Sequence, residues 1–143
     1  SGLDANQREQ VWLDHHLRGA LEANQFALHY QPKLLLESGR ATSVEGLLRW
    51  THPERGNIPP DHFISRAEAT GLIIPIGRWV IETAALQAAK WAEQGRAVRV
   101  AINVSARQLV DPELMPRLRS AQSIAAPVAL SAQASEVSTI GAV

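Results

Sequence analysis

The chain has no cysteine among its 143 residues. It therefore has no disulfide framework, no thiolate zinc site and no thiol nucleophile, and any bound metal must use oxygen or imidazole ligands. The lack of cysteine also fits a reducing compartment. We expect the protein to be cytoplasmic, either alone or as the cytoplasmic part of a larger sensor protein.

The sequence also lacks an excess of one charge sign, and it has no long hydrophobic run. Fourteen Lys and Arg balance fourteen Asp and Glu, so no strong field attracts nucleic-acid polymers or anionic lipids. The longest apolar run, 124–130, is far shorter than the roughly 20 residues that cross a bilayer, and the N-terminus has no secretory signal. We expect no nucleic-acid polymer as partner and no membrane segment in this chain.

The composition is that of a globular domain, with 45% hydrophobic and 20% charged residues. Periodicity predicts alternating helices and strands. Helices are predicted over 11–24, from an N-cap at Asp61 to a stop at Gly71, over 75–94, and from an N-cap at Asp111. Strands are predicted over 26–32, 42–50 and 98–105, with a turn at 37–40 and a loop over 51–60. The first two strands should pair antiparallel, and the helical crossover before the third strand implies parallel pairing with the second.

The composition changes at Ser120. Residues 120–143 contain seven Ala and five Ser, and Glu136 is their only charge. Neither a helical stripe nor strand alternation is sustained there, so we expect a disordered or improvised tail.

Three polar side chains lie on predicted strands. Glu45 and Arg49 share one face of the second strand, because strand side chains alternate with period two. Asn103 lies near the carboxyl end of the third strand, where ligands gather in α/β proteins, so Glu45 and Asn103 could converge as oxygen ligands of Mg²⁺ or Mn²⁺.

Each of these side chains also has a plain structural interpretation. Glu45 and Arg49 could form a solvated strand face with a cross-strand ion pair. Asn103 could be a turn or cap residue, and Ser105 is better explained as a helix N-cap than as a nucleophile.

Several short motifs occur in a fixed order along the chain. They are Tyr30-Gln31-Pro32-Lys33, Glu45-Gly46-Leu47-Leu48-Arg49-Trp50, Phe63-Ile64, Ala67-Glu68, Gly71-Leu72-Ile73 and Asn103-Val104-Ser105. This order resembles the EAL domains, which hydrolyse cyclic di-GMP. The resemblance implies three segments: a helix over 1–16 that links to an upstream domain, the N-terminal part of an EAL domain over 17–119, and a non-matching tail over 120–143.

The resemblance implies an α/β fold, a partial TIM-like (β/α) barrel with an antiparallel first strand pair, truncated after about three strands. It implies hydrolysis of cyclic di-GMP to linear pGpG with Mg²⁺ or Mn²⁺ as cofactor. By position, Glu45 and Asn103 would be metal ligands. Arg49 would neutralise a ligand phosphate, and Gln31 would line the nucleotide pocket.

The sequence departs from the family pattern at Gly46, where the family has alanine, and at Ser65, where it usually has proline. The later carboxylate motifs are also absent, and a closed barrel needs on the order of 250 residues. We therefore expect this chain alone to be inactive. An alternative is a non-catalytic cyclic di-GMP or protein-interaction module that self-associates through exposed strands. An unrelated small α/β domain with accidental motif matches is the remaining alternative.

Overall fold

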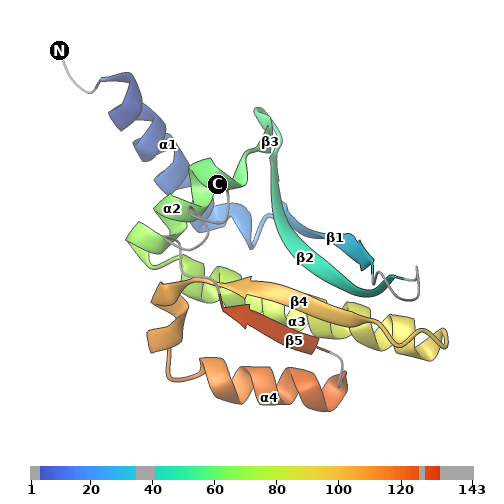
Figure 1. Ribbon diagram of the computed structural model, residues 1–143. Helices are drawn as coiled ribbons and strands as arrows, with labels where there is room; N and C mark the ends of the chain where they lie inside the picture. The colour runs from blue at the N-terminus through green and yellow to red at the C-terminus, as the bar shows by residue number, and fades with distance from the viewer. Residues whose placement is uncertain (1–3, 35–40, 126–127, 133–143) are drawn as a thin grey trace.

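A computed structural model of the protein describes residues 4–34, 41–125 and 128–132. Helices and strands are mixed along the chain (Figure 1). In order, the elements are α1 (Ala5–Ala20), β1 (Phe26–Leu34), β2 (Ala41–His52), β3 (Gly56–Ile58), α2 (Pro60–Thr70), α3 (Ile73–Glu93), β4 (Arg99–Val104), the 3₁₀-helix η1 (Ala106–Val110), α4 (Leu114–Ile124) and β5 (Val128–Ala132).

The strands form one five-stranded sheet, in which the main order is β1-β2-β4-β5 and β3 pairs with β2. β1 and β2 are antiparallel, whereas β2 with β4 and β4 with β5 are parallel. The predicted α/β class, the antiparallel first pair and the parallel crossover are therefore confirmed. The expectation of about three strands is wrong, because β3 and β5 also join the sheet.

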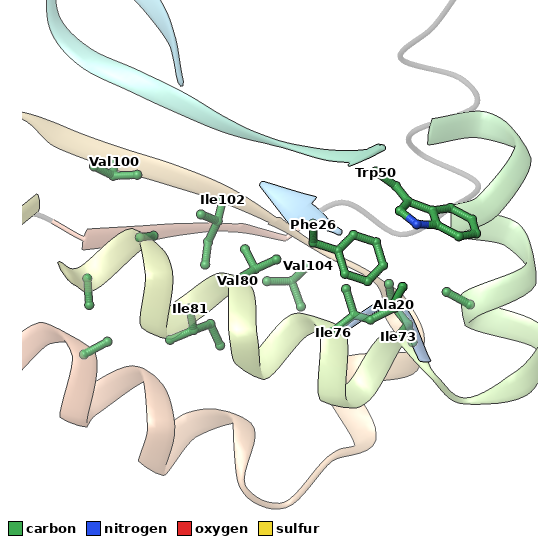
Figure 2. Packing of buried hydrophobic residues seen from close by; sticks show 14 of the residues in the cluster. Ala20, Phe26, Trp50, Ile73, Ile76, Val80, Ile81, Val100, Ile102 and Val104 are labelled. Carbon is green, nitrogen blue, oxygen red and sulfur yellow. The ribbon is translucent and has the colours of Figure 1, made fainter. Parts of the chain in front are cut away.

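One face of the sheet packs against α3, and α3 in turn packs against α4 (Figure 1). Along β4, Val100, Ile102 and Val104 are buried. Figure 2 shows these side chains directed toward Ile81 and its neighbours on α3. Burying an aliphatic side chain of this size stabilises the fold by about 1.5–3 kcal/mol. The alternation also leaves the intervening side chains of β4 on the opposite face of the sheet.

An aromatic cluster closes the other end of the core, where α1 and α2 lie against each other. Trp50 and Phe63 are fully buried, and their ring centroids are 5.5 Å apart in an edge-to-face arrangement. The Trp50 indole N–H donates to Oε1 of Gln25 at 3.0 Å, so its polar atom is satisfied. This cluster anchors the carboxyl end of β2.

The region after β2 differs from the prediction of a loop over 51–60. β2 continues to His52, and β3 folds back so that Trp50 faces Ile58 across an antiparallel pair. The short β3 carries one buried residue and a left-handed glycine, Gly56, at its start. Such short strands give weak periodicity in the sequence.

Two predicted N-caps are also wrong. α2 begins at Pro60 with Pro59 as N-cap, so Asp61 lies inside the first turn. α4 begins at Leu114, although the Asp111 carboxylate does accept the Glu113 N–H just before it. The predicted stop at Gly71 is confirmed, with a left-handed φ of 83°.

The expectation of a structureless tail from residue 120 is wrong for two segments. α4 continues to Ile124, and β5 pairs with β4 in parallel over Val100–Val104 and Val128–Ala132. Backbone pairing of this kind does not require strong side-chain alternation. The predicted turn at 37–40 and residues 133–143 lie outside the described residues.

Among the described residues, no single helix has the length and apolar character needed to cross a membrane. Only α2 and α3 taken together pass on length and composition, and they meet at a bend of 118°.

Candidate metal and nucleotide site

Three polar side chains from three strands meet on the face of the sheet that lies opposite α3. The Asn103 side-chain amide donates to Oε1 of Glu45 at 3.2 Å. The Lys33 ammonium lies 3.7 Å from Oε2 of the same carboxylate. The predicted convergence of Glu45 and Asn103 is thus observed, and Lys33 joins them.

Strand register explains this meeting. Gln31 of β1 and Ala101 of β4 are both Cα partners of Glu45, so all three side chains share one face. Lys33 and Asn103 lie two residues further along their strands and therefore share it too. Gln31 itself is exposed. The alternation brings all four predicted site residues, Gln31, Glu45, Arg49 and Asn103, to this face.

Gly46 lies on the opposite face, between Tyr30 and Ile102. A Cβ at this position would be 3.5 Å from each of these two side chains, which is ordinary van der Waals contact. Burial raises the pKa of Tyr30 to about 12. Within the part of the chain that the structure describes, its hydroxyl has no hydrogen-bond partner. Tyr30 is therefore a packing residue and is unsuited to proton transfer near neutral pH.

A cavity of about 480 Å³ opens beside Asn103, between the carboxyl ends of β2 and β4 and helices α2 and α3. Arg49 and Asn103 line it, whereas Glu45 and Gln31 do not. Its polar lining residues are Arg49, Asp61, Ser65, Glu68, Asn103, Ser105 and Gln108. Cavities of this volume hold small organic ligands.

The contribution of α2 is absent from the sequence prediction, which treats Asp61 only as a cap. Asp61, Ser65 and Glu68 are spaced i, i+4 and i+7, so they form one helical stripe. That stripe faces the cavity lined by Arg49. The spacing of these three polar residues could have predicted the stripe from the sequence. Only the packing of α2 near β2 shows that the stripe faces the cavity.

Lys33 was a second omission among the site residues. It alternates with Gln31 on β1, so its side chain had to share the face of Gln31. The plain alternative of a cross-strand ion pair is partly correct, because Glu45 does have such a partner. The partner is Lys33, whereas Arg49 donates to the Leu48 carbonyl at 3.4 Å.

The segment after Asn103 is held by a buried glutamine. Ser105 is the N-cap of η1, as predicted, and its backbone N–H donates to Oε1 of Gln108 at 2.9 Å. The Gln108 amide lies so close to Gly77 of α3 that a Cβ there would be 2.7 Å from Cδ. Glycine at 77 therefore lets the carboxyl end of β4 approach α3.

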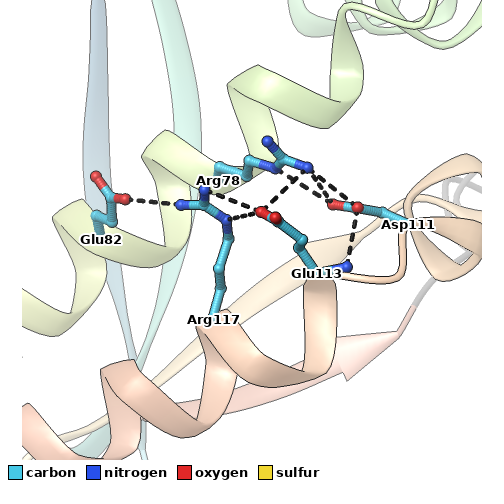
Figure 3. A network of polar contacts seen from close by, with 5 residues as sticks. All are labelled: Arg78, Glu82, Asp111, Glu113 and Arg117. Atoms are coloured by element: carbon cyan, nitrogen blue, oxygen red, sulfur yellow. Dashed lines mark hydrogen bonds and ion pairs between the residues drawn. The ribbon is translucent and has the colours of Figure 1, made fainter.

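An ion-pair network then fixes η1 and α4 to α3 (Figure 3). The Arg78 guanidinium contacts both oxygens of Asp111, with the shortest distance 3.1 Å, and Arg117 bridges Glu82 and Glu113. The hydrogen bond from Arg78 lowers the pKa of Asp111. The network lies on the helical side of the sheet, so its role is to hold the scaffold.

The donor set at Glu45 suits a hard dication but is small. A carboxylate and an amide oxygen are ligands that Mg²⁺ and Mn²⁺ accept. Among the described residues, no group of three or more His, Cys, Asp or Glu side chains could hold a metal ion. The remaining ligands would have to come from water, a phosphate or other residues.

Known proteins resemble this chain in sequence and fold. Residues 14–139 match the EAL domain family, a range that runs beyond residue 119. The cyclic di-GMP phosphodiesterase PdeR of Escherichia coli is 52% identical over 118 residues, which are 81% of this chain and 18% of PdeR. The bifunctional diguanylate cyclase/cyclic di-GMP phosphodiesterase MucR of Pseudomonas aeruginosa is 46% identical over 122 residues, which are 85% of this chain and 18% of MucR.

A solved structure agrees with the sequence relatives. PaMucR phosphodiesterase, determined as a c-di-GMP complex, superposes with a TM-score of 0.78 at 42% identity, over 83% of this chain and 50% of that chain. The chain thus spans about a fifth of the length of the two curated relatives and half of this solved chain. From the family match, the relatives and the shared fold, this chain belongs to the EAL domain family.

Proposed function

We propose that this chain forms part of a metal-dependent site for cyclic di-GMP, of the kind used by phosphodiesterases that open the dinucleotide to linear pGpG. The observation that carries this proposal is the contact between Glu45 and Asn103 on one sheet face, beside a cavity lined by Arg49. The relatives named as cyclic di-GMP phosphodiesterases support the choice of substrate.

Glu45 and Asn103 are the residues that would hold Mg²⁺ or Mn²⁺. The Glu45 carboxylate supplies one hard oxygen donor, and turning the Asn103 amide would direct its oxygen rather than its nitrogen toward the same point. When bound, a dication would supply the positive charge that polarises a phosphodiester for attack by water. Mg²⁺ commonly binds proteins through one or two side chains and completes its shell with water and phosphate.

Arg49 and Gln31 would bind the nucleotide itself. The Arg49 guanidinium is half-buried, lines the cavity and can pair with a phosphate in a bidentate geometry. Gln31 is exposed on the Glu45 face and offers both a donor and an acceptor to a base or a ribose. The polar stripe Asp61, Ser65 and Glu68 faces the cavity that Arg49 lines and provides acceptors for base or ribose hydrogens.

We further propose that the 143-residue polypeptide by itself hydrolyses cyclic di-GMP slowly or not at all. Its described residues bring one carboxylate, Glu45, to the sheet face where the metal would bind. A phosphodiester clamp with two metal ions needs several carboxylates to offset the charge of the ions. Binding of the nucleotide with Mg²⁺ is therefore expected to be easier to detect than its turnover.

The test combines a cyclic di-GMP binding titration, with and without Mg²⁺, and a hydrolysis assay that detects pGpG. We expect binding that depends on Mg²⁺. Glu45→Gln and Arg49→Met should each weaken this binding by about tenfold or more, because each substitution removes a charged contact. Glu22→Gln is the matched control, since this glutamate is exposed and lies just after α1. Equal binding by Glu45→Gln and the unmodified chain would contradict the proposed site. Rapid turnover that depends on Glu45 would contradict the proposed inactivity.

A second candidate function is self-association through the sheet. In the described residues, β1 and β5 are the outer strands of the main order β1-β2-β4-β5, and each has one neighbour. Outer strands present unpaired N–H and C=O groups to a second chain. Sedimentation analysis tests this candidate, and a monomer at high concentration would exclude it.

A further inference from the structure

The Glu45 carboxylate is engaged at both oxygens by groups of the protein. Oε1 accepts from the Asn103 amide at 3.2 Å, and Oε2 lies 3.7 Å from the Lys33 ammonium. A cation that binds this carboxylate must therefore compete with Lys33 for Oε2. Nothing in the roles assigned above requires a positive side chain at this position.

Lys33 is placed to yield to such a cation. Its side chain is 55% exposed, whereas that of Glu45 is 24% exposed. Exposed ion pairs are weak, because water stabilises the separated charges and a long side chain loses rotamer freedom when it is held. The lysine can therefore move into solvent without unfolding the strand that carries it.

Lys33 and a dication also cannot both stay close to Glu45 without repulsion. An ammonium within a few ångströms of a doubly charged ion lowers the affinity for that ion even in high dielectric. The positive charge of Lys33 thus raises the metal concentration at which the site fills. When the ion is absent, the Lys33 ammonium lies near Oε2 and offsets part of the carboxylate charge.

We propose that Lys33 is a positioning residue that acts as a displaceable counter-ion of Glu45 and sets the metal affinity of the site. This inference rests on the proposed role of Glu45 as a metal ligand. It concerns the positive charge at position 33, which lies on β1 beside Glu45.

The test is a Mn²⁺ titration of the whole 143-residue chain, followed by paramagnetic broadening of the Asn103 side-chain amide signals in NMR spectra. Lys33→Met should tighten Mn²⁺ binding by about three- to tenfold, because it removes both the competing ion pair and the repulsion. Lys33→Arg keeps the charge and should leave the affinity near that of the unmodified chain. Lys90→Met is the matched control, since the chain has two lysines and Lys90 is exposed on α3.

Unchanged or weaker Mn²⁺ binding by Lys33→Met would overturn the proposal. So would a loss of cyclic di-GMP binding at unchanged Mn²⁺ affinity, because it would make Lys33 a nucleotide contact. Glu45→Gln separates this failure from failure of the proposed function. If Mn²⁺ broadens Asn103 equally in Glu45→Gln, Glu45 does not hold the metal and both proposals fail. If Glu45→Gln abolishes broadening but Lys33→Met has no effect, only the role of Lys33 fails.

Discussion

The amide nitrogen of Asn103 lies 3.2 Å from Oε1 of Glu45, and the two residues come from parallel neighbours in the sheet although 58 positions separate them in the sequence. Both side chains are solvent-accessible, so their hydrogen bond competes with water. A contact of this kind contributes little to folding. Its geometry is the basis of the metal-ligand role that we propose for both residues.

The first prediction follows from that exposure. Asn103→Ala should change the free energy of unfolding by less than about 0.5 kcal/mol, the usual range for surface substitutions. The same substitution should weaken Mn²⁺ binding, because one of two oxygen donors is lost. Denaturant unfolding and Mn²⁺ titration of one sample measure both effects. A large stability loss with unchanged Mn²⁺ binding would make Asn103 a structural residue.

The second prediction concerns Gly46, where alanine would restore the usual family residue. A Cβ there would lie 3.5 Å from Tyr30 and Ile102, at ordinary contact distance. Since glycine loses more backbone freedom on folding than alanine, Gly46→Ala should stabilise the chain by about 0.5–1 kcal/mol. Thermal unfolding tests this value. A destabilised variant would mean that the strands cannot accept the methyl group.

The third prediction concerns a glycine for which the opposite result is expected. Gly77→Ala would place a Cβ against the buried Gln108 amide and force it away from the Ser105 N–H. Overpacking and the lost hydrogen bond together should cost about 1–3 kcal/mol.

Gly19→Ala is the matched helical control for this substitution. Gly19 lies within α1, and an added Cβ would meet nothing within 4 Å. This variant should gain about 0.5–1 kcal/mol, since alanine is the better helix former. Urea unfolding of both variants is the measurement, and a stabilised Gly77→Ala would show that Gln108 can move at no cost.

The fourth prediction uses a histidine pair that joins α1 to the end of β2. Nδ1 of the buried His52 accepts the Glu54 N–H at 3.1 Å, so its Nε2 carries the proton in the neutral ring. Nε2 lies 3.1 Å from Nδ1 of His16, which must therefore accept. Protonation of His16 would remove this acceptor.

Burial, followed by the nearby His52 and His15, lowers the pKa of His16 below its ordinary value of 6.5. Arg55 lowers it as well, whereas Glu54 raises it. The unfolded chain therefore binds protons at a higher pH than the folded chain does. Stability should be fully present above about pH 6.5 and should fall as the pH drops below that value.

Urea unfolding between about pH 7.5 and about pH 5 measures this dependence, because that range extends to both sides of the ordinary histidine pKa. His16→Asn should reduce the loss of stability at low pH. His62→Asn is the control, because His62 is exposed on α2, and it should keep the original pH dependence. The same slope in His16→Asn as in the unmodified chain would assign the effect to other groups.

Local patterns in the sequence predict most of the elements around the site. The alternation in β1, β2 and β4, the stop at Gly71 and the N-cap at Ser105 are confirmed because each depends on neighbouring residues. The errors occur where other parts of the fold decide the outcome. β3 forms because His52 and Gly56 can pair when the chain turns back, and β5 forms because β4 offers a free edge.

The sequence alone determined which side chains share a face of each strand, since a period of two is a property of the extended backbone. It also determined the family, because several short motifs occur in the order that is typical of EAL domains. The tertiary structure decided the register that joins Lys33, Glu45 and Asn103, and the packing that sets the α2 stripe beside Arg49. Contacts of this kind depend on how separate elements align, and alignment is set by the packing of the whole core rather than by neighbours along the chain.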